Sequence, residues 1–303
     1  MPSVSSLDEA AAALAAAHVE GGRVRIGDDL TTDGLNRVLE HDPGDLTCTV
    51  EAGVRLSELR AVLAASGQRL SLDPPGDPTI GALLARNVSG PLRHRFGAPR
   101  DLVLGATLVL ADGTIASSGG KVVKNVAGYD LGRLVCGSEG RLAFIGRASF
   151  RLHPLPRADG TLVVETEDVA VVVARLLGSQ LQASAVDVLH PGRVAVLFEG
   201  SERAVAAQLA SARALVGGDE ASADVWGESR ERQGAVRGRI RFAPGDLAET
   251  LATLDEAIVR PAAGVAYTDS DEPSYKLLQA RNDATSRLLG SVKAALDPRG
   301  VLS

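Results

Sequence analysis

Cysteine is scarce in this sequence of 303 residues, which contains two. Cys48 and Cys136 stand far apart, each beside apolar residues, and no Cys-x-x-Cys pair or Cys/His ligand spacing occurs. A disulfide framework and a zinc site are therefore not indicated, and a reducing compartment fits. The five histidines do not combine with neighbouring carboxylates into a ligand set. We therefore predict that the protein holds no metal ion.

Long apolar runs are also missing. No uninterrupted apolar segment reaches the ~18 residues that indicate a membrane-spanning helix. The first residues lack the basic region of a secretory signal, and Asp8 and Glu9 interrupt the apolar segment that follows. We therefore expect a cytoplasmic protein without direct membrane insertion.

Basic residues are fewer than acidic residues: 32 Lys and Arg stand against 38 Asp and Glu, which gives a net charge of -6. This balance argues against nucleic acid or an anionic membrane surface as the main partner. Aromatic residues make up only 3% of the chain, whereas 45% is apolar. A chain of this length exceeds what one core usually covers, so we expect more than one domain.

Glycine, by contrast, is plentiful, and it recurs between residues 73 and 156. Small, glycine-containing sequences follow apolar segments there, namely DPPG at 73–76, NVSG at 87–90, GGK at 119–121 and GSEG at 137–140. Such positions let a backbone approach a ligand closely. Thr79 is expected to cap a short helix over residues 80–85, whose free N–H groups would favour a phosphate. The arrangement indicates an extended nucleotide that lies along the main chain.

Three further sequences complete an ordered set of motifs: RHRFG at 93–97, RDLVLG at 100–105 and KNVAGYDL at 124–131. Over residues 45–156 the set resembles the PCMH-type (vanillyl-alcohol-oxidase-like) FAD proteins, and among them the FAD-binding subunits of bacterial glycolate oxidases (GlcE type). The resemblance implies an α+β chain with a PCMH-type FAD-binding fold of two α/β lobes plus an antiparallel-sheet cap domain.

The same resemblance implies FAD as the cofactor. The family's covalent link through histidine has no obvious counterpart, so the FAD should be non-covalent. The residues expected to bind it are those that match the family motifs: Pro74, Gly76, Thr79, Ile80, Gly81, Asn87, Ser89, Gly90, Gly97, Gly128, Gly137, Ser138, Gly140 and Ile145.

Some positions depart from the family pattern. The phosphate loop expected after a strand at residues 23–27 is shortened or missing, and Asp28 and Asp29 stand where phosphate oxygens are expected. Like charges in that place oppose binding. Smaller residues of the family are replaced at four positions, by Ala82, Arg86, Arg141 and Ala143. One alternative therefore stays open, in which the glycines serve only turns and strand packing.

Pro154 and Pro156 mark a boundary in the chain. The resemblance implies that residues 1–156 form the FAD-binding domain, with lobes 1–70 and 71–156, that residues 157–272 form the cap, and that residues 273–303 form a helix that returns to the FAD domain. In the first part we expect helices over 7–17 and 57–65, the second capped by Ser57, strands over 23–27, 46–50, 102–110 and 142–152, and a hairpin turn at 112–113.

In the cap part, two rounds of strand, helix and strand predict an antiparallel sheet with helices on one face. The expected elements lie at 161–164, 169–177, 185–189, 194–198, 204–216, 236–242, 247–258 and 264–267. The polar residues 217–234 are interpreted as a loop that carries Trp226, and residues 247–258 as a helix. Ser274 should cap the final helix, which stops at residues 297–300.

Catalytic residues cannot be named from this sequence. His94 could face a flavin edge, but a surface basic cluster is the simpler interpretation. The three arginines at alternate positions 237, 239 and 241 could hold an acid, although a solvated strand edge is simpler. A flavin-dependent oxidation of a hydroxy acid needs a base and a cation near the substrate, and no clustered pair of this kind is evident.

The sequence thus predicts the FAD-binding subunit of a glycolate (2-hydroxy acid) oxidase or dehydrogenase complex, which transfers electrons from a small hydroxy-acid substrate through flavin. The resemblance implies two partners, a larger FAD subunit and an iron–sulfur subunit. Two alternatives remain: a flavin-free assembly subunit that keeps the fold, and a stand-alone FAD-dependent dehydrogenase.

Overall fold

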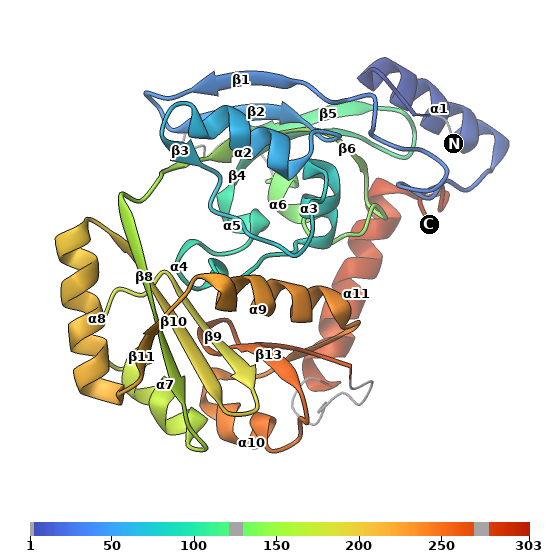
Figure 1. Ribbon diagram of the computed structural model, residues 1–303. Coiled ribbons are helices and arrows are strands. Elements are labelled where there is room, and N and C mark those ends of the chain that lie inside the picture. The colour runs from blue at the N-terminus through green and yellow to red at the C-terminus, as the bar shows by residue number, and fades with distance from the viewer. Residues whose placement is uncertain (1–2, 121–129, 270–278) are drawn as a thin grey trace.

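The computed structural model describes residues 3–120, 130–269 and 279–303. Two antiparallel sheets form its framework, and helix α9 (Asp224–Ala235) lies between them, as Figure 1 shows. Helix α11 (Gln279–Leu296) runs along one side of both sheets. This α+β architecture, with a separate antiparallel sheet beyond residue 156, confirms the predicted fold class. The predicted divisions at residues 156 and 272 stay predictions.

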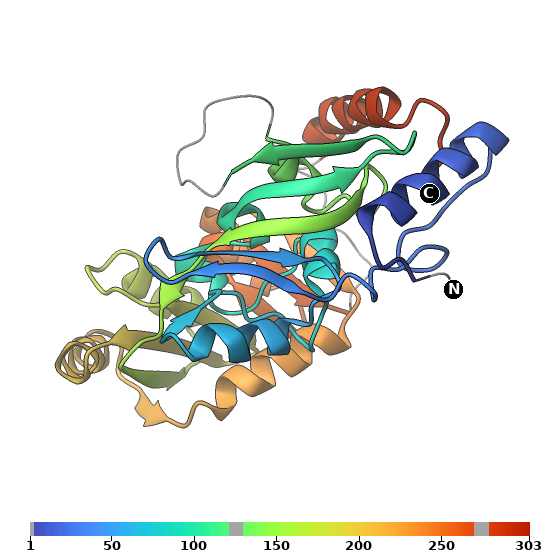
Figure 2. The same cartoon turned by 90° about the horizontal axis from the view of Figure 1, so that it is seen from above.

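The first sheet contains five strands in the order β1-β2-β6-β4-β5, which can be followed from above in Figure 2. They are β1 (Val38–Asp42), β2 (Thr47–Glu51), β6 (Phe144–Arg151), β4 (Val103–Val109) and β5 (Ile115–Gly119). Strands from both predicted lobes therefore share one sheet. The β4–β5 hairpin turns at Gly113, whose positive φ of 86° suits glycine and agrees with the predicted turn.

Five short helices accompany this sheet: α2 (Leu56–Ala64), α3 (Ile80–Arg86), α4 (Arg93–Phe96), α5 (Pro99–Leu102) and α6 (Leu131–Val135). Leu56, Leu59 and Leu63 repeat at helical spacing on α2 and are fully buried in the core of this region. The predicted cap of α2 was wrong. Arg55 is the N-cap, and Ser57 instead donates its N–H and hydroxyl to the Asp77 carboxylate, at 2.8 and 2.7 Å.

The N-terminal segment contains one predicted element that forms and one that does not. Helix α1 (Leu7–Glu20) forms with Ser6 as its N-cap and continues three residues beyond the predicted helix over residues 7–17. Residues 23–27 do not form a regular strand. Val24 instead makes a single bridge to the chain's last residues, since its N–H donates to the Val301 carbonyl (2.6 Å) and its carbonyl accepts from the Ser303 N–H (3.1 Å). The backbone groups of Val24 are thus hydrogen-bonded to residues that are distant in the sequence.

The second sheet contains seven strands in the order β11-β8-β10-β9-β13-β14-β12. Their bounds are β8 (Ala158–Glu165), β9 (Ala185–His190), β10 (Arg193–Gly200), β11 (Asp219–Ala221), β12 (Gly238–Arg241), β13 (Ala257–Arg260) and β14 (Val265–Thr268). All the pairings between these strands are antiparallel. A two-stranded pair of β3 (Gln68–Arg69) and β7 (His153–Pro154) lies where the chain leaves the first sheet.

Helices cover both faces of the second sheet, whereas helices on one face were predicted. Three of them, α7 (Val169–Leu177), α8 (Glu202–Val216) and α10 (Leu247–Leu251), share one core. Helix α9 lies against the other face through Val225 and Trp226, next to Ile258 and Tyr267 of the sheet. The sheet is therefore enclosed between two helical layers, and α9 is the layer that faces the first sheet (Figure 1).

Two predicted cap elements were wrong. Residues 217–234 were expected to be a loop, but they contain β11 and α9, whose buried face includes polar Ser229 and Gln233 and so carries little apolar periodicity. Residues 247–258 were expected to be one helix, but α10 ends at Leu251. Ala257 and Ile258 pair with His190 and Leu189 of β9. Tertiary pairing has overridden local helix propensity there.

Helix α11 brings the chain back to the first sheet. Its Val292 and Leu296 pack against the core of that region. Lys293 donates to the carbonyls of Arg141 (2.7 Å) and Leu302 (2.6 Å) and pairs with Asp297 (2.5 Å). The predicted cap Ser274 lies outside the described residues. Across the described part of the chain, none of the helices combines the length and the apolar character that a membrane span requires.

Candidate functional site

A cavity of about 530 Å³ opens beside α3 in the first region. Three segments form its walls: residues 26–33, helix α3 with its cap, and residues 139–145. The lining residues are Ile26, Gly27, Thr31, Thr32, Asp33, Thr79, Gly81, Ala82, Ala85, Arg86, Glu139, Gly140, Ala143 and Ile145. The volume lies within the ~300–1,000 Å³ range of small-molecule and cofactor sites. The cavity is therefore large enough to take part of a nucleotide.

The first wall is a tight turn rather than an extended loop. The Gly27 N–H donates to the Leu30 carbonyl (2.9 Å), and the Asp29 carboxylate accepts from the Arg25 N–H (2.9 Å). Asp28 and Asp29 also form ion pairs with the Arg25 guanidinium, each at 3.6 Å. Neither aspartate lines the cavity. The carboxylates of these two residues thus pair with Arg25, and the repulsion of phosphate expected from them does not come from the cavity wall.

The second wall is the start of α3. Thr79 caps the helix as predicted, because its Oγ1 accepts from the Ala82 N–H at 3.3 Å. The predicted free N–H groups are not there. The Ile80 N–H donates to the Val54 carbonyl (2.9 Å), and the Gly81 N–H donates to the Ala52 carbonyl (2.7 Å). The first turn of α3 is therefore used for packing and offers no unpaired amide among these three residues to a phosphate.

The third wall is the turn at residues 137–140, which docks on the end of α3. The Gly137 N–H donates to the Leu84 carbonyl (3.0 Å), and the Glu139 N–H donates to the Ala85 carbonyl (2.9 Å). At Gly140, φ is +80° and an added Cβ would lie 2.9 Å from the Ile26 Cβ. Glycine there lets the third wall touch the first.

Several polar side chains line the cavity, among them Thr31, Arg86 and the acid Asp33. Thr31 Oγ1 is buried and has no hydrogen-bond partner in the described part of the chain. A buried hydroxyl without a partner is costly, so the position suits a polar ligand atom. Arg86 is exposed and adds a cation that can pair with phosphate. These two groups fit the polar part of FAD.

Residues that depart from the family pattern do not close the cavity. Ala82 and Ala143 add only methyl groups to its walls, and Arg86 lies at its edge. Arg141 does not line it and pairs with the Glu139 carboxylate at 2.8 Å. The described side chains thus leave room for a nucleotide, although less of the main chain is free to hold it than the sequence suggested.

Of the residues predicted to bind FAD, Thr79, Gly81, Gly140 and Ile145 line this cavity. Ile80 lies beside them on α3 and is buried. Gly137 and Ser138 belong to the turn that forms the third wall; Ser138 Oγ is buried and has no partner in the described residues. Direct contact of any of these with FAD stays a prediction.

A second group of predicted residues lies between the two sheets. The Ser89 carbonyl accepts from Gln233 Nε2 (3.0 Å) and from Arg260 Nη1 (3.2 Å), and both donors come from the second sheet region. At Gly90, an added Cβ would lie 1.7 Å from the Asp73 carbonyl oxygen. Ser89 therefore links the two regions, while Gly90 packs against Asp73 within the first region, and neither residue lines the α3 cavity.

The remaining predicted residues serve turns or lie elsewhere. Asn87 adopts a positive φ of 47° and its Oδ1 accepts from the Arg100 N–H (3.1 Å), while Gly97 has a φ of +81° beside Asp101. Gly76 also has a positive φ and is exposed, whereas Pro74 is buried. The predicted residue Gly128 lies outside the described residues.

A buried polar network joins the two sheets near Ser89, and sequence reasoning missed it. Arg260 and Asp187, with side-chain exposures of 1% and 0%, form an ion pair at 3.3 Å. Asp187 also accepts from the Ser229 hydroxyl (2.6 Å), and Arg260 donates to Gln233 Oε1 (2.7 Å). The residues come from β9, α9 and β13. No local signal could have revealed them, because α9 and the start of β13 were themselves mispredicted.

Two titratable groups lie beside this network. Burial raises the pKa of Asp73 to about 7, although Arg260 and the Leu92 N–H oppose the shift. Burial lowers the pKa of His94 from its ordinary value, and Asp187 partly offsets the shift. Asp73 therefore titrates near neutral pH, where groups that exchange protons in active sites are often found.

The two cysteine thiols are poor nucleophiles, and the potential metal ligands among the described residues are not grouped. Burial raises the pKa of Cys48 and of Cys136 to about 12, so neither forms a thiolate near neutral pH. Within the described ranges, no three His, Cys, Asp or Glu side chains are grouped so that they could hold a metal ion.

A family comparison indicates the class of protein that part of this chain resembles. Residues 17–119 match the family described as "FAD binding domain", and this segment contains the first two walls of the cavity. The match agrees with the resemblance found in the sequence, and FAD is the cofactor that it supports.

Particular relatives extend this match. The chain is 34% identical over 217 residues to "Glycolate oxidase subunit GlcE" of Escherichia coli (strain K12), which covers 70% of this chain and 61% of the relative. It is 38% identical over 152 residues to "Glycolate oxidase subunit GlcD" of Bacillus subtilis (strain 168), which covers 50% of this chain and 31% of the relative. The chain thus spans less than two thirds of each.

A solved structure shows the same fold. The chain superposes on "alkyldihydroxyacetonephosphate synthase" with a TM-score of 0.72 over 99% of this chain and 74% of that one. Their sequence identity is 16%. At this identity the likeness concerns the fold alone.

Proposed function

We propose that this chain is the FAD-binding subunit of a complex that oxidises glycolate or a similar small 2-hydroxy acid. The observation that carries the proposal is the α3 cavity, two of whose walls lie in the segment that matches the FAD-binding family. Its unpartnered Thr31 hydroxyl and its Arg86 cation suit a nucleotide. The similarity to the GlcE subunit supports glycolate as the substrate.

FAD, when bound, supplies the two-electron redox chemistry that protein side chains lack. Thr31, Thr79 and Arg86 would hold its polar part, while Ile26 and Ile145 present apolar surface to the rest. Non-covalent attachment is part of this proposal, and the absence of histidine and cysteine among the described residues that line the cavity supports it.

The proposed complex contains two further subunits, a larger FAD subunit and an iron–sulfur subunit. Similarity to both the GlcE and the GlcD subunits supports an origin within such an assembly. In this proposal the three-part division at residues 156 and 272 holds, the second sheet completes the substrate pocket, and the complex works in the cytoplasm.

The test begins with the cavity and uses a matched pair of charge reversals. Arg86→Glu places an acid at the cavity edge and should lower FAD retention strongly. Arg175→Glu makes the same change on an exposed position of α7 in the second region and should leave retention unchanged. FAD is measured in the supernatant after acid denaturation of the purified chain. Equal FAD content in both variants would show that FAD does not bind in the α3 cavity.

Substrate oxidation needs the complex. Co-expression with a large flavoprotein subunit and an iron–sulfur subunit should yield an assembly that reduces an artificial electron acceptor when glycolate is added. D-Lactate as a parallel substrate measures how narrow the specificity is. An assembly that forms but reduces the acceptor with neither acid would exclude hydroxy-acid oxidation.

A flavin-free assembly subunit is the second candidate, and one observation favours it. The amides at the start of α3 and in the 137–140 turn that were expected to hold phosphate are paired inside the protein, at Ile80, Gly81, Gly137 and Glu139. A chain that joins the complex without any flavin of its own would satisfy this candidate and contradict the first.

A further inference from the structure

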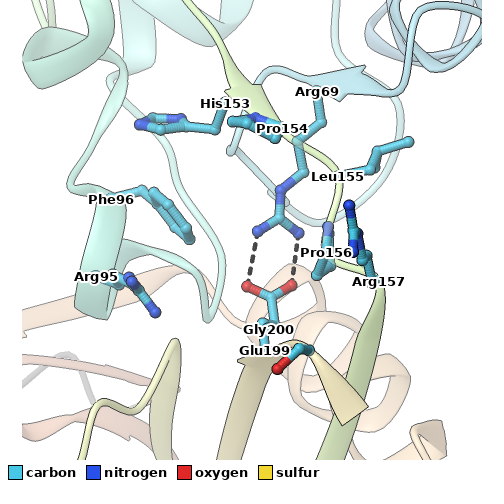
Figure 3. Close-up of a pocket in the computed structure, with 11 residues that line it drawn as sticks. Arg69, Arg95, Phe96, His153, Pro154, Leu155, Pro156, Arg157, Glu199 and Gly200 are labelled. Atoms are coloured by element: carbon cyan, nitrogen blue, oxygen red, sulfur yellow. Dashed lines mark hydrogen bonds and ion pairs between the residues drawn. The ribbon is translucent and has the colours of Figure 1, made fainter. Parts of the chain in front are cut away.

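A second pocket, of about 450 Å³, lies where the chain passes from the first sheet to the second. It shares no lining residue with the α3 cavity. Figure 3 shows its walls, which come from β3, α4, the connection at residues 153–157 and the end of β10. Because both sheet regions contribute, a ligand bound there would contact each of them.

An ion pair crosses the pocket. Arg69 of β3 donates two hydrogen bonds to the Glu199 carboxylate of β10, at 2.6 and 2.7 Å. The fork geometry engages both oxygens of the acid, as drawn in Figure 3. Arg69 holds the pKa of Glu199 below its usual value against the opposing effect of burial. Glu199 is thus ionised, and its carboxylate is paired with Arg69.

Two further arginines at the pocket have no acidic partner within the described ranges. Arg95 stands on α4, where its guanidinium lies 5.7 Å from the Phe96 ring centroid, and Arg157 stands at the start of the connection into β8. Figure 3 places them on either side of the Arg69–Glu199 pair. With Glu199 balancing Arg69, the charged residues that line the pocket leave an excess of positive charge on a chain whose net charge is -6.

The remaining walls are aromatic and apolar. The Phe96 ring centroid lies 4.7 Å from that of His153, and Pro154, Leu155 and Pro156 continue the surface. His153 Nδ1 is buried and has no partner among the described residues. Burial, with the nearby arginines Arg151, Arg69 and Arg95, lowers the pKa of His153 to about 4. The ring is therefore neutral at pH 7 and offers a hydrogen-bonding atom without charge.

We propose that this pocket binds a small dicarboxylate, whose two carboxylates pair with Arg95 and Arg157 while its carbon chain lies against Phe96 and the prolines. Arginine matches a carboxylate with two parallel hydrogen bonds, and two arginines on separate walls match two carboxylates. The apolar side chains that line the pocket beside the Arg69–Glu199 pair suit methylene groups. The proposal does not depend on flavin, because no residue of the α3 cavity takes part.

Succinate is the probe, and calorimetric titration of the full chain is the measurement. Succinate should bind with one site per chain, and succinamide, its neutral diamide, should not bind. Arg95→Gln and Arg157→Gln each remove one charged pair and should weaken binding at least about tenfold, the loss expected for one charged hydrogen-bonding partner. Arg175→Gln, at an exposed position on α7, is the matched control and should bind succinate like the wild type.

Both test arginines are exposed, so circular dichroism should show that the variants keep the fold. If one variant were to unfold, the other still decides the result, since each breaks a different pair. Absence of saturable binding to the wild type, or equal affinity in all three variants, would overturn the proposal. Inorganic phosphate binding as tightly as succinate would overturn the dicarboxylate class.

Discussion

The two sheet regions differ in how each is packed internally. In the region that contains the FAD-binding match, glycines let main chains touch: an added Cβ at Gly90 would lie 1.7 Å from the Asp73 carbonyl oxygen, and one at Gly53 would lie 2.0 Å from that of Thr32. In the second region, apolar helix faces pack on a sheet, and a buried ion pair of Asp187 and Arg260 lies on the side that faces the first region.

This difference changes the meaning of the glycine motifs. In a sequence, a glycine that admits a ligand and a glycine that admits another part of the chain look alike. Here Gly81 and Gly90 admit protein, whereas side chains such as Thr31, Asp33 and Arg86 give the cavity its polar character. The case for FAD therefore depends on the cavity and on the family match more than on free main-chain amides.

The largest effect expected from this comparison is at Gly90. Gly90→Ala forces a Cβ into the Asp73 carbonyl, where no side chain can yield, and should cost more than about 4 kcal/mol or prevent folding. In the matched variant Gly76→Ala, the added Cβ meets no atom within 4 Å, so the only cost is that alanine must adopt the positive φ of this position. It should cost about 1 kcal/mol. Urea unfolding of both variants makes the comparison, and similar losses would show that close packing does not explain Gly90.

The buried ion pair comes next. Asp187→Ala leaves the Arg260 guanidinium buried without its acid and should lower the free energy of unfolding by about 3 kcal/mol or more. Asp28→Ala removes a partner of Arg25 in an exposed pair at 3.6 Å and should change stability by less than about 1 kcal/mol. Thermal or urea unfolding measures both. A small loss at Asp187 would mean that the junction between the sheets is not held by this network.

Asp73 should make stability depend on pH. Its pKa is raised to about 7 in the folded chain by burial, against the effects of Arg260 and Arg230 and with that of Asp187. An unfolded aspartate ionises near pH ~4, so between these values the folded state holds one more proton than the unfolded state. This contribution is therefore largest at low pH and falls by about 1.4 kcal/mol per unit as the pH rises from 5 to 7.

Asp73→Asn isolates that effect. The amide keeps an oxygen that can accept from the Leu92 N–H, as Asp73 Oδ1 does at 3.0 Å, but it cannot ionise. Relative to wild type, the variant should gain stability at pH 8 and lose that advantage at pH 4. Urea unfolding at both pH values tests this, and a difference that does not change with pH would contradict the assignment.

The smallest effect concerns the hydroxyl in the cavity. Thr31→Val keeps the side-chain shape and removes Oγ1, so FAD affinity should fall by about 1 kcal/mol, or roughly fivefold. Thr107→Val removes a hydroxyl that lies 3.1 Å from the Ser117 Oγ, outside the cavity, and should leave affinity unchanged. Quenching of flavin fluorescence on titration gives both dissociation constants. Identical constants would mean that Thr31 does not face the cofactor.

Local signals in the sequence were sufficient for much of the fold. Helix α7 was predicted with its bounds at residues 169–177, because Val169, Val172, Val173 and Leu176 repeat at helical spacing. The Thr79 cap was also predicted. The errors arose where a distant segment decides the local structure: residues 23–27 bind the last residues of the chain, and β13 forms because β9 pairs with it.

For the candidate site, too, sequence reasoning failed where contacts between distant segments decide the structure. Motif matching reached Thr79, Gly81, Gly140 and Ile145, which line one cavity. It could not reach Thr31, which forms an isolated bridge with Ser3 outside any motif, or the pairing of the α3 amides with the carbonyls of Ala52 and Val54. Such pairing depends on how two segments approach in space, which spacing in one sequence does not encode.

The central claim is that this chain holds FAD in the cavity beside α3. Visible absorption of the purified chain tests it most directly, with the flavin quantified after acid denaturation. The account predicts flavin absorption bands at close to one FAD per chain and, because the proposed attachment is non-covalent, release of the flavin on denaturation. A folded, colourless chain that also fails to take up added FAD would contradict it.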